Sequence, residues 1–489
     1  MLFNRVLRNT FSLFTGKAAS HALTALFNIY LTRVLGKEFY GDFTGALSWI
    51  VMFSIVAEYG LGTLMTRLIA RNPERSDELF WNSVILKTFC SLLAFLLAVG
   101  ALYLRRLFSF GEGGESDLVL ISIFSLFLFA NAWYMSLAAV LRGHQDNHLE
   151  AGLFLTGKIV YVVLGFATIL CHSLGLQLQT RLMAFYFSLG ALVPLLLGLL
   201  ILKRRYKLTA PKFSFSVCLE LLSQGWQFFT IMFTSTLHLK FDHVLLWWFG
   251  FKAQLGVYSA AYNLVLIPLF LTNSFTESMY PALAASKEKG EEDFWARVMV
   301  SLRWIGCLGF PFLFWATLEA PRVMEFMYGK EFVEGALAFQ ILVWGQGLDL
   351  FCPFFGHVLY AKEQERRVFF INMASLIGNI LANILLLYFL CVAKGNDPTL
   401  APVASALSMV ISLSIMLFGY LISFSRFGRT LESLLALGRP ALLALLLAPL
   451  VWFLRPFVPV YLTWLVYGVI FLTLALLLKI VKLSDHRRF

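Results

Sequence analysis

Four basic side chains lie inside long apolar runs of the chain. Lys17 and His21 stand four residues apart, so they share one face of a helix. Lys158 and Lys240 lie in two further runs. A charge at mid-bilayer costs about 2.5–3.5 kcal/mol on insertion scales, so such residues are expected to face a bundle interior. A lysine ammonium is a suitable point charge for phosphate, and we therefore predict that these four residues bind a phosphorylated substrate.

The depth of each cation within its run leaves some alternatives open. Lys17 lies only about one and a half turns inside, so snorkelling of its ammonium to the membrane surface is equally open. Lys158 lies about two turns inside and is flanked by Gly157 and Tyr161, which favours an interior position. Lys87 lies nearer the end of its run, and we expect it to snorkel.

Three acidic residues in apolar runs are the predicted ion-coupling groups: Glu58, Asp242 and Glu277. A carboxyl group in a dry helix bundle can exchange a proton or bind Na⁺ as access alternates between the two sides. An ion pair with a neighbouring helix is an equally open interpretation for Glu58. For Asp242 the alternative is an interfacial charge near the outer leaflet.

The motifs of common enzyme classes do not occur in the sequence. There is no HExxH helix, no phosphate loop ending in Lys-Ser/Thr and no GxSxG turn. The six cysteines stand singly in or beside apolar runs and lack metal-site spacing. We therefore predict that the protein is not an enzyme and has no metal site and no cofactor. The energy source is then either coupling to H⁺ or Na⁺ or downstream consumption of the substrate.

The composition sets the environment in which these residues work. Of 489 residues, 59% are apolar and 14% are charged, against roughly a quarter charged in globular chains. The mean hydropathy of +0.77 excludes an ordinary water-soluble domain. The net charge of +11 does not indicate nucleic-acid binding, because the basic residues are spread between the apolar runs. The bilayer is the expected solvent.

Apolar windows of about 20 residues predict an all-α integral membrane protein with about 14 transmembrane helices. The predicted spans are 11–33, 43–66, 80–104, 118–141, 151–172, 182–202, 219–246, 256–281, 295–318, 335–360, 368–392, 401–424, 432–454 and 459–481. If the amino terminus is inside, the inner connections hold more than twice as many Lys and Arg residues as the outer ones. We therefore predict a multi-pass protein of the inner membrane with both termini in the cytoplasm.

Two pairs of segments indicate an internal repeat. Gly36 and Gly41 recur as Gly250 and Gly256. The segment 140–145 resembles the segment 358–363, at nearly the same offset along the chain. Two agreeing offsets predict six-helix halves, which have the same orientation because their helix number is even.

This repeat predicts three parts of the chain: a first six-helix lobe over 1–210, a second over 211–425, and two additional helices with a cytoplasmic tail over 426–489.

Four stretches carry a family resemblance. They are Arg33–Gly41; Glu58–Leu61 with Arg67–Ala70; Asp242 followed by Gly256–Tyr262; and Tyr328–Phe332. Together they resemble the polysaccharide-exporter, or lipid-linked oligosaccharide flippase, family of the multidrug/oligosaccharidyl-lipid/polysaccharide exporter superfamily. The resemblance covers residues 1–425, and one departure from the family is the turn Asn396–Thr399, which replaces a glycine-rich one.

The resemblance implies two lobes around a central cavity. It implies movement of a polyprenyl-pyrophosphate-linked oligosaccharide from the cytoplasmic to the outer leaflet by alternating access, for cell-surface polysaccharide such as the O-antigen of lipopolysaccharide. The implied partners are the lipid-linked oligosaccharide, the bilayer, a polysaccharide polymerase and glycosyltransferases. Lipid II flippases place several arginines in the first two helices, whereas the first span here holds only Lys17.

Two alternatives remain open. A cation-coupled multidrug exporter would need acids to outnumber bases in its cavity, and exporters of that kind commonly carry an acid in the first helix. No Asp or Glu lies between Phe11 and Arg33. A membrane polysaccharide polymerase would need a large outer loop, and the outer loops are mostly under about fifteen residues.

Overall fold

The structure is a computed structural model in which the described part of the chain is helical. It describes residues 2–107, 115–170, 174–206, 213–266, 283, 286, 290–393 and 397–481, with side chains from residue 19 onward except those of residues 346 and 392. No strand occurs over these ranges. The predicted all-α class is therefore confirmed.

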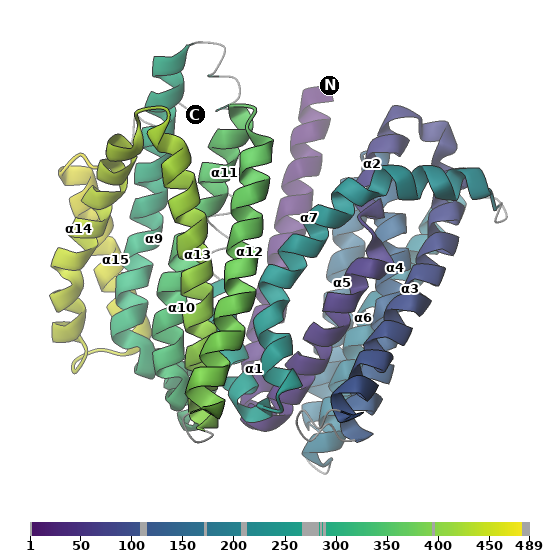
Figure 1. The fold of residues 1–489 in the computed structure, drawn as a ribbon, viewed down its shortest axis with the longest axis horizontal. Coiled ribbons are helices and arrows are strands. Elements are labelled where there is room, and N and C mark those ends of the chain that lie inside the picture. The colour runs from purple at the N-terminus through teal and green to yellow at the C-terminus, as the bar shows by residue number, and fades with distance from the viewer. Residues whose placement is uncertain are drawn as a thin grey trace. The chain divides into compact units, whose positions relative to one another are not determined.

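The helices fall into two compact units, Met1–Gly256 and Val257–Phe489, which we call the first and the second unit. The first unit contains α1 (Leu2–Glu58), α2 (Leu61–Arg71), α3 (Ser76–Leu107), α4 (Glu115–Gly143), α5 (Asn147–Leu170), α6 (Leu176–Arg205) and α7 (Phe215–Trp248). The second contains α9 (Glu291–Tyr328), α10 (Ala336–Asp349), α11 (Cys352–Ala361), α12 (Glu365–Leu387), α13 (Ala401–Ser425), α14 (Thr430–Leu454) and α15 (Val460–Leu477) (Figure 1).

Eleven segments of the described residues are long and apolar enough to cross a membrane. The predicted number of 14 is not confirmed. The first two predicted spans lie in one continuous segment, Ala19–Arg71, and α7 is not among the eleven. The run 256–281 lies largely outside the described residues.

Helix α1 bends at Gly36, where two helical segments meet. Gly36 has φ 71° and ψ 173°, a backbone conformation that strains any residue with a Cβ. The sequence had predicted a connection between two spans at this point. A single left-handed glycine makes that connection, so the chain changes direction without a loop.

Two segments of the proposed repeat meet inside the first unit. A Cβ atom placed on Gly41 would lie 1.8 Å from the carbonyl oxygen of Lys252, and one placed on Gly256 would lie 1.8 Å from that of Lys37. The contact is reciprocal, because Lys252 and Gly256 follow Lys37 and Gly41 at the same offset along the chain. The backbones touch directly, so neither position has room for a side chain.

The second pair of repeat segments contains two turns with the same conformation. Gln145 after α4 has φ 61°, and Glu363 after α11 has φ 60°. In each turn the next residue's N–H donates to the carbonyl five residues earlier, Asp146 to Leu141 at 2.8 Å and Gln364 to Leu359 at 2.9 Å. This is the six-to-one hydrogen bond of a Schellman helix end. The segments 140–145 and 358–363 therefore end their helices in the same way.

In the second unit, α14 and α15 pack on α9. Leu443, Ala444, Phe471 and Ala475 form an apolar cluster with Cys307 of α9. The indole N–H of Trp315 donates to the Thr463 hydroxyl at 3.0 Å. Glu319, which is fully buried, pairs with Arg322 at 2.9 Å. The two C-terminal helices are thus part of the second unit's core.

Candidate functional site

The crossing of α5 and α6 places Lys158 beside a pocket. At this crossing a Cβ atom on Gly157 would lie 2.1 Å from the carbonyl oxygen of Gly190. The reciprocal distance, from a Cβ on Gly190 to the Gly157 carbonyl oxygen, is 2.8 Å. Glycine at both positions lets the helix backbones approach closely, as at small-residue interfaces of membrane helices. Lys158 follows Gly157, so its direction is set by this contact.

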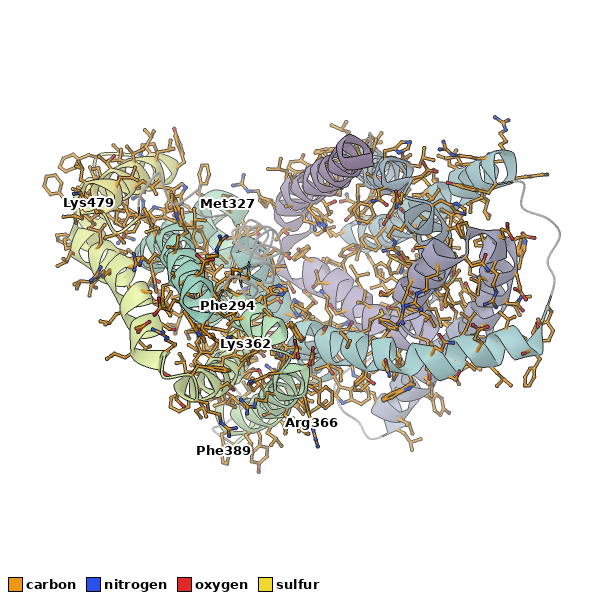
Figure 2. All side chains as sticks on the ribbon, turned by 90° about the horizontal axis from the view of Figure 1, so that it is seen from above. Phe294, Met327, Lys362, Arg366, Phe389 and Lys479 are labelled. Carbon is orange, nitrogen blue, oxygen red and sulfur yellow. The ribbon has the colours of Figure 1, made fainter. Side chains whose placement is uncertain are left out.

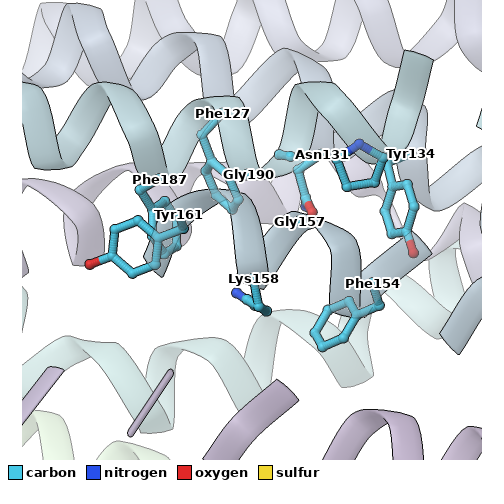
Figure 3. Close-up of a pocket in the computed structure, with 11 residues that line it drawn as sticks. Phe127, Asn131, Tyr134, Phe154, Gly157, Lys158, Tyr161, Phe187 and Gly190 are labelled. Carbon is cyan, nitrogen blue, oxygen red and sulfur yellow. The ribbon is translucent and has the colours of Figure 1, made fainter. Parts of the chain in front are cut away.

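The pocket next to Lys158 is small, with a cavity volume of about 50 Å³, and is lined by three helices of the first unit (Figure 3). The lining residues are Phe127, Asn131 and Tyr134 of α4; Phe154, Gly157, Lys158 and Tyr161 of α5; and Phe187, Gly190, Ala191 and Pro194 of α6. Among the described residues, Lys158 is the one charged group of this lining, and no carboxylate contributes to it. We call it the Lys158 pocket.

The Lys158 ammonium lies over two aromatic faces. Its Nζ atom is 5.4 Å from the ring centroid of Phe154 and 5.2 Å from that of Phe187. Within the described residues no carboxylate oxygen lies within 4 Å of it, whereas Lys87 has one carboxylate partner and Lys252 has two. Cation–π contact is worth about 0.5–2 kcal/mol, less than a full charge pair in a dry site. The ammonium can therefore take an anionic ligand without first losing an ion pair.

His21 lies close to this pocket, as the substrate-binding prediction requires. Its ring centroid is 6.0 Å from that of Phe154, the ring that Lys158 also contacts. His21 is exposed within the structure. The fold thus brings two of the four predicted cations to the same ring. The side chain of Lys17 lies outside the described residues.

The remaining predicted residues do not line the Lys158 pocket. Lys240 lies on α7 and is half-buried. Asp242, on the same helix, is 2% exposed. Glu277 lies outside the described residues. The roles of these three residues stay predictions.

Glu58 forms an ion pair with a neighbouring helix. Its Oε2 atom lies 2.5 Å from Nζ of Lys87, and its Oε1 atom accepts the backbone N–H of Gly62 at 3.0 Å. Lys87 is fully buried and also donates to the carbonyl oxygen of Ala132 at 3.2 Å. The prediction that Lys87 snorkels was wrong, because a carboxylate and a carbonyl satisfy its ammonium inside the unit. Ion coupling through Glu58 stays a prediction.

A second charged network, which the sequence did not predict, lies where α1, α3 and α4 meet residue 252. Nζ of Lys252 is 2.6 Å from a carboxylate oxygen of Asp42 and 2.9 Å from one of Asp117. Asp117 also pairs with buried Arg105 at 3.2 Å. Burial is the largest influence and lowers the pKa of Lys252, but the two carboxylates outweigh it, and the pKa is raised. Lys252 and Arg105 lie near the ends of apolar runs in the sequence, yet in the fold they join helices through ion pairs.

At the opposite end of α4, His144 is held in a polar cluster. Its Nε2 atom lies 2.8 Å from the Ser76 hydroxyl, and its ring is 4.5 Å from that of Tyr206. The Tyr206 hydroxyl donates to Asp146, which also pairs with Arg205 at 2.9 Å. Burial lowers the pKa of His144, and burial with the Asp146 carboxylate raises the pKa of Tyr206.

The sequence identified Lys158 and Tyr161 of the pocket but missed its other aromatic residues. Phe154 lies at four residues before Lys158, and Tyr161 at three after it, so helical spacing could have found them. Phe127 and Phe187 come from other helices, and no local pattern distinguishes them from the 49 phenylalanines of the chain.

Solved structures similar to this one are membrane transporters. A structure titled "Lipid II flippase MurJ, inward closed conformation" matches with a TM-score of 0.73 at 14% identity, covering 94% of this chain and 98% of that one. An inward-facing multidrug resistance MATE family transporter of the MOP superfamily matches with a TM-score of 0.65 at 15% identity, covering 84% and 96%. A mutant of the Vibrio cholerae MATE transporter VcmN matches with a TM-score of 0.55 at 14% identity, covering 86% and 97%.

These likenesses establish the fold. No curated protein matches the sequence significantly. The family described as "Polysaccharide biosynthesis protein" matches residues 6–287, which is more than half of the chain. This match confirms the family resemblance found in the sequence, and the protein belongs to the polysaccharide biosynthesis protein family.

Proposed function

We propose that the protein is a flippase that carries a polyprenyl-pyrophosphate-linked oligosaccharide across the cytoplasmic membrane by alternating access. Membership of a polysaccharide biosynthesis family and a fold shared with a lipid II flippase support this proposal. The observation that carries it is the Lys158 pocket, where a cation lies among aromatic faces with no carboxylate partner in the described part of the chain.

The pocket matches the chemistry of a phosphorylated glycan. The Lys158 ammonium provides a point charge for a phosphate oxygen, and His21 is close enough to share that headgroup. The rings of Phe154 and Phe187 offer flat apolar faces to sugar rings. The polyprenyl chain stays in lipid, since only the headgroup is costly to move through hydrocarbon.

Net movement requires an energy source and a difference in affinity between the two facing states. Coupling to H⁺ or Na⁺ through Asp242 or Glu277 is the proposed source, together with consumption of the flipped substrate by glycosyltransferases and a polymerase. Glu58 is a weaker candidate, because Lys87 already occupies its carboxylate. The proposal includes an inner-membrane location, cytoplasmic termini and the lobes 1–210 and 211–425.

A liposome assay tests the proposal. The purified protein is reconstituted with a polyprenyl-pyrophosphate glycan that carries a fluorophore, and a membrane-impermeant quencher reports the leaflet. Protein-dependent movement of label between leaflets is expected. Absence of movement by folded protein would overturn the proposal.

Variants of Lys158 locate the site within the same assay. Lys158→Gln should slow transport about tenfold or more, because a charged hydrogen bond is worth about 1.5–3 kcal/mol. Lys158→Arg should restore part of the rate. Lys203→Gln, at an exposed cation outside the pocket, is the matched control and should leave the rate unchanged. A normal rate for Lys158→Gln would remove Lys158 from the site.

A drug exporter is the second candidate, because MATE transporters share the fold. The Lys158 pocket argues against a cationic drug, since the charged residue that lines it is positive. Transport of a lipophilic cation such as tetraphenylphosphonium, together with no glycan movement, would favour the exporter.

A further inference from the structure

The amino-terminal half of α7 differs in direction from the spans of the first unit. Figure 1 shows it running across the first unit near the α2 label before α7 turns along the bundle, and Figure 2 shows it along one side. Residues 230–248 alone would extend about 28 Å, close to the roughly 30 Å thickness of the hydrocarbon core, although α7 is not among the eleven apolar segments. Residues 215–229 are therefore not needed for the crossing.

One face of residues 215–229 packs on the first unit. Cys218 is 6% exposed and Leu221 is fully buried. Arg75 pairs with Glu220 at 2.9 Å, which fixes this helix to the start of α3. The Ser214 N–H donates to Oδ1 of Asn82 at 2.7 Å, so the helix start is held as well.

A second face is apolar and exposed. Phe215 is 65% exposed, Leu219 50% and Trp226 55%. At 100° per residue these three positions fall within about 40° of arc, so they form a narrow strip. Nothing in the first unit covers these side chains over the described residues. We call them the apolar strip of α7.

The third face is polar and exposed. Ser216, Ser223, Gln224 and Gln227 lie on it, all on one side of the apolar strip. The helix therefore presents three sectors, which contact protein, an apolar phase and water in turn. A helix at the edge of a soluble protein needs only a buried sector and a polar one, so the exposed apolar sector calls for another environment.

We propose that residues 215–229 form an interfacial helix whose apolar strip inserts into the bilayer surface at the boundary of headgroups and acyl chains. A helix with one polar and one apolar exposed face lies about 5–10 Å into this boundary. Trp226 fits this place, because tryptophan is enriched at membrane interfaces. The Arg75–Glu220 ion pair ties this helix to the start of Pro73–Leu107, a segment long and apolar enough to cross a membrane, so the helix lies at the end of a span.

The interfacial helix ends in direct contact with the junction of α1 and α2. Phe229 stacks on Tyr59 at 4.9 Å, and a Cβ on Gly60 would meet the backbone of Phe229 at 2.6 Å. Tyr59 and Gly60 are the left-handed pair that separates α1 from α2. The interfacial helix therefore contacts the break between these two helices.

Nitroxide labels at single cysteines test the inference in proteoliposomes. The background has its six native cysteines replaced and is checked for folding by circular dichroism. Labels at Leu219 and Trp226 should collide mainly with oxygen and lie about 5–10 Å below the phosphates. Labels at Ser223 and Gln227, the matched controls on the same turns, should collide mainly with a water-soluble nickel chelate.

Two outcomes would overturn the inference. Equal access of the nickel chelate to all four labels would place the strip in water. Protection of positions 219 and 226 from both reagents would mean that protein covers the strip. If the cysteine-free chain does not fold, p-benzoylphenylalanine at Trp226 or Gln227 of the native chain replaces the labels: lipid adducts from position 226 and not from 227 support the inference, and adducts to protein alone overturn it.

Discussion

Helices α5 and α6 of the first unit cross at a contact that differs from the one at which α12 and α13 of the second unit cross. In the first, Gly157 and Gly190 bring the backbones into direct contact. In the second, the Ser375 hydroxyl donates to the carbonyl oxygen of Ser412, and the Ser412 hydroxyl to that of Ser375, each at 2.8 Å. Ser375 follows Gly157 at the offset that relates the two repeat turns. Glycine lets the backbones touch, whereas serine joins the two helices by hydrogen bonds.

The residue that follows each crossing differs between the two units. Lys158 follows Gly157 and borders the Lys158 pocket. The residue at the same offset is Leu376, which is 3% exposed. The neighbouring polar group on α12, Asn372, is occupied by the Tyr420 hydroxyl at 3.2 Å. The position beside the first crossing therefore holds a charge at a pocket, whereas its counterpart is a buried leucine. The groove that α12 and α13 form, at Phe370, Phe418 and Ile422, has no charged residue in its lining among the described residues.

The largest effect on stability is expected when Leu376, the counterpart of Lys158 in the second unit, is replaced by lysine. Leu376→Lys would bury an ammonium in a filled interior, at a cost of about 2.5–3.5 kcal/mol. The thermal midpoint of the detergent-solubilised protein should fall strongly. Lys158→Leu should leave it nearly unchanged, because Lys158 has only ring contacts worth about 0.5–2 kcal/mol to lose. Equal tolerance at the two positions would contradict a pocket beside Lys158 and a buried site at Leu376.

A smaller effect is expected from a methyl group at the first crossing. Gly157→Ala should lower the free energy of unfolding by about 1–3 kcal/mol, since the added carbon meets a carbonyl oxygen. Gly152→Ala on the same helix is the control, because its Cβ would meet nothing within 4 Å. Ser375→Ala should cost about 0.6 kcal/mol, the mean for such hydrogen bonds in membranes. Thermal unfolding measures the stability of the three variants. An unchanged stability of Gly157→Ala would contradict the backbone contact between α5 and α6.

The smallest effect on stability is expected from a change of pH at the two equivalent turns. These turns contain His144 and Lys362. Burial lowers the pKa of His144, which Arg205 reinforces and Asp146 opposes. The unfolded chain therefore binds more protons below about pH 6.5, and stability should fall as the pH drops from 7 to 5. Lys362 pairs with Glu291 at 2.5 Å and lies 4.5 Å from the Phe294 ring (Figure 2).

The measurement is the thermal midpoint as a function of pH. His144→Gln should flatten the curve between pH 7 and 5, whereas Lys362→Gln should leave its slope unchanged. The same slope for His144→Gln as for the unmodified protein would show that another group titrates.

The sequence predicted features that depend on local pattern. The helical class follows from long apolar runs, and the two repeat offsets point to segments that share a turn or a contact. Lys158 was identifiable because a charge in an apolar run is costly. Features that depend on packing between distant segments were not predictable. The pairing of Glu58 with Lys87 joins residues 29 positions apart, and the Lys252–Asp117 pair joins residues 135 apart.

The run 219–246 shows a different limit. Its hydropathy predicts one span, yet its first part lies in the helical segment that runs across the first unit near the α2 label of Figure 1. Apolar content alone does not distinguish a residue facing lipid at the surface from one inside the bilayer. The three-sector arrangement around residues 215–229 becomes visible only when the buried face is known.

The reciprocal contact of Gly41 and Gly256 restricts how this chain can change. A Cβ on either glycine would meet the other segment's backbone carbonyl oxygen, which every residue type carries, so no substitution in the other segment can make space for it. A lost glycine at either position therefore has no compensating substitution at its counterpart. Two short segments, far apart along the chain, must be inherited together as a matched pair.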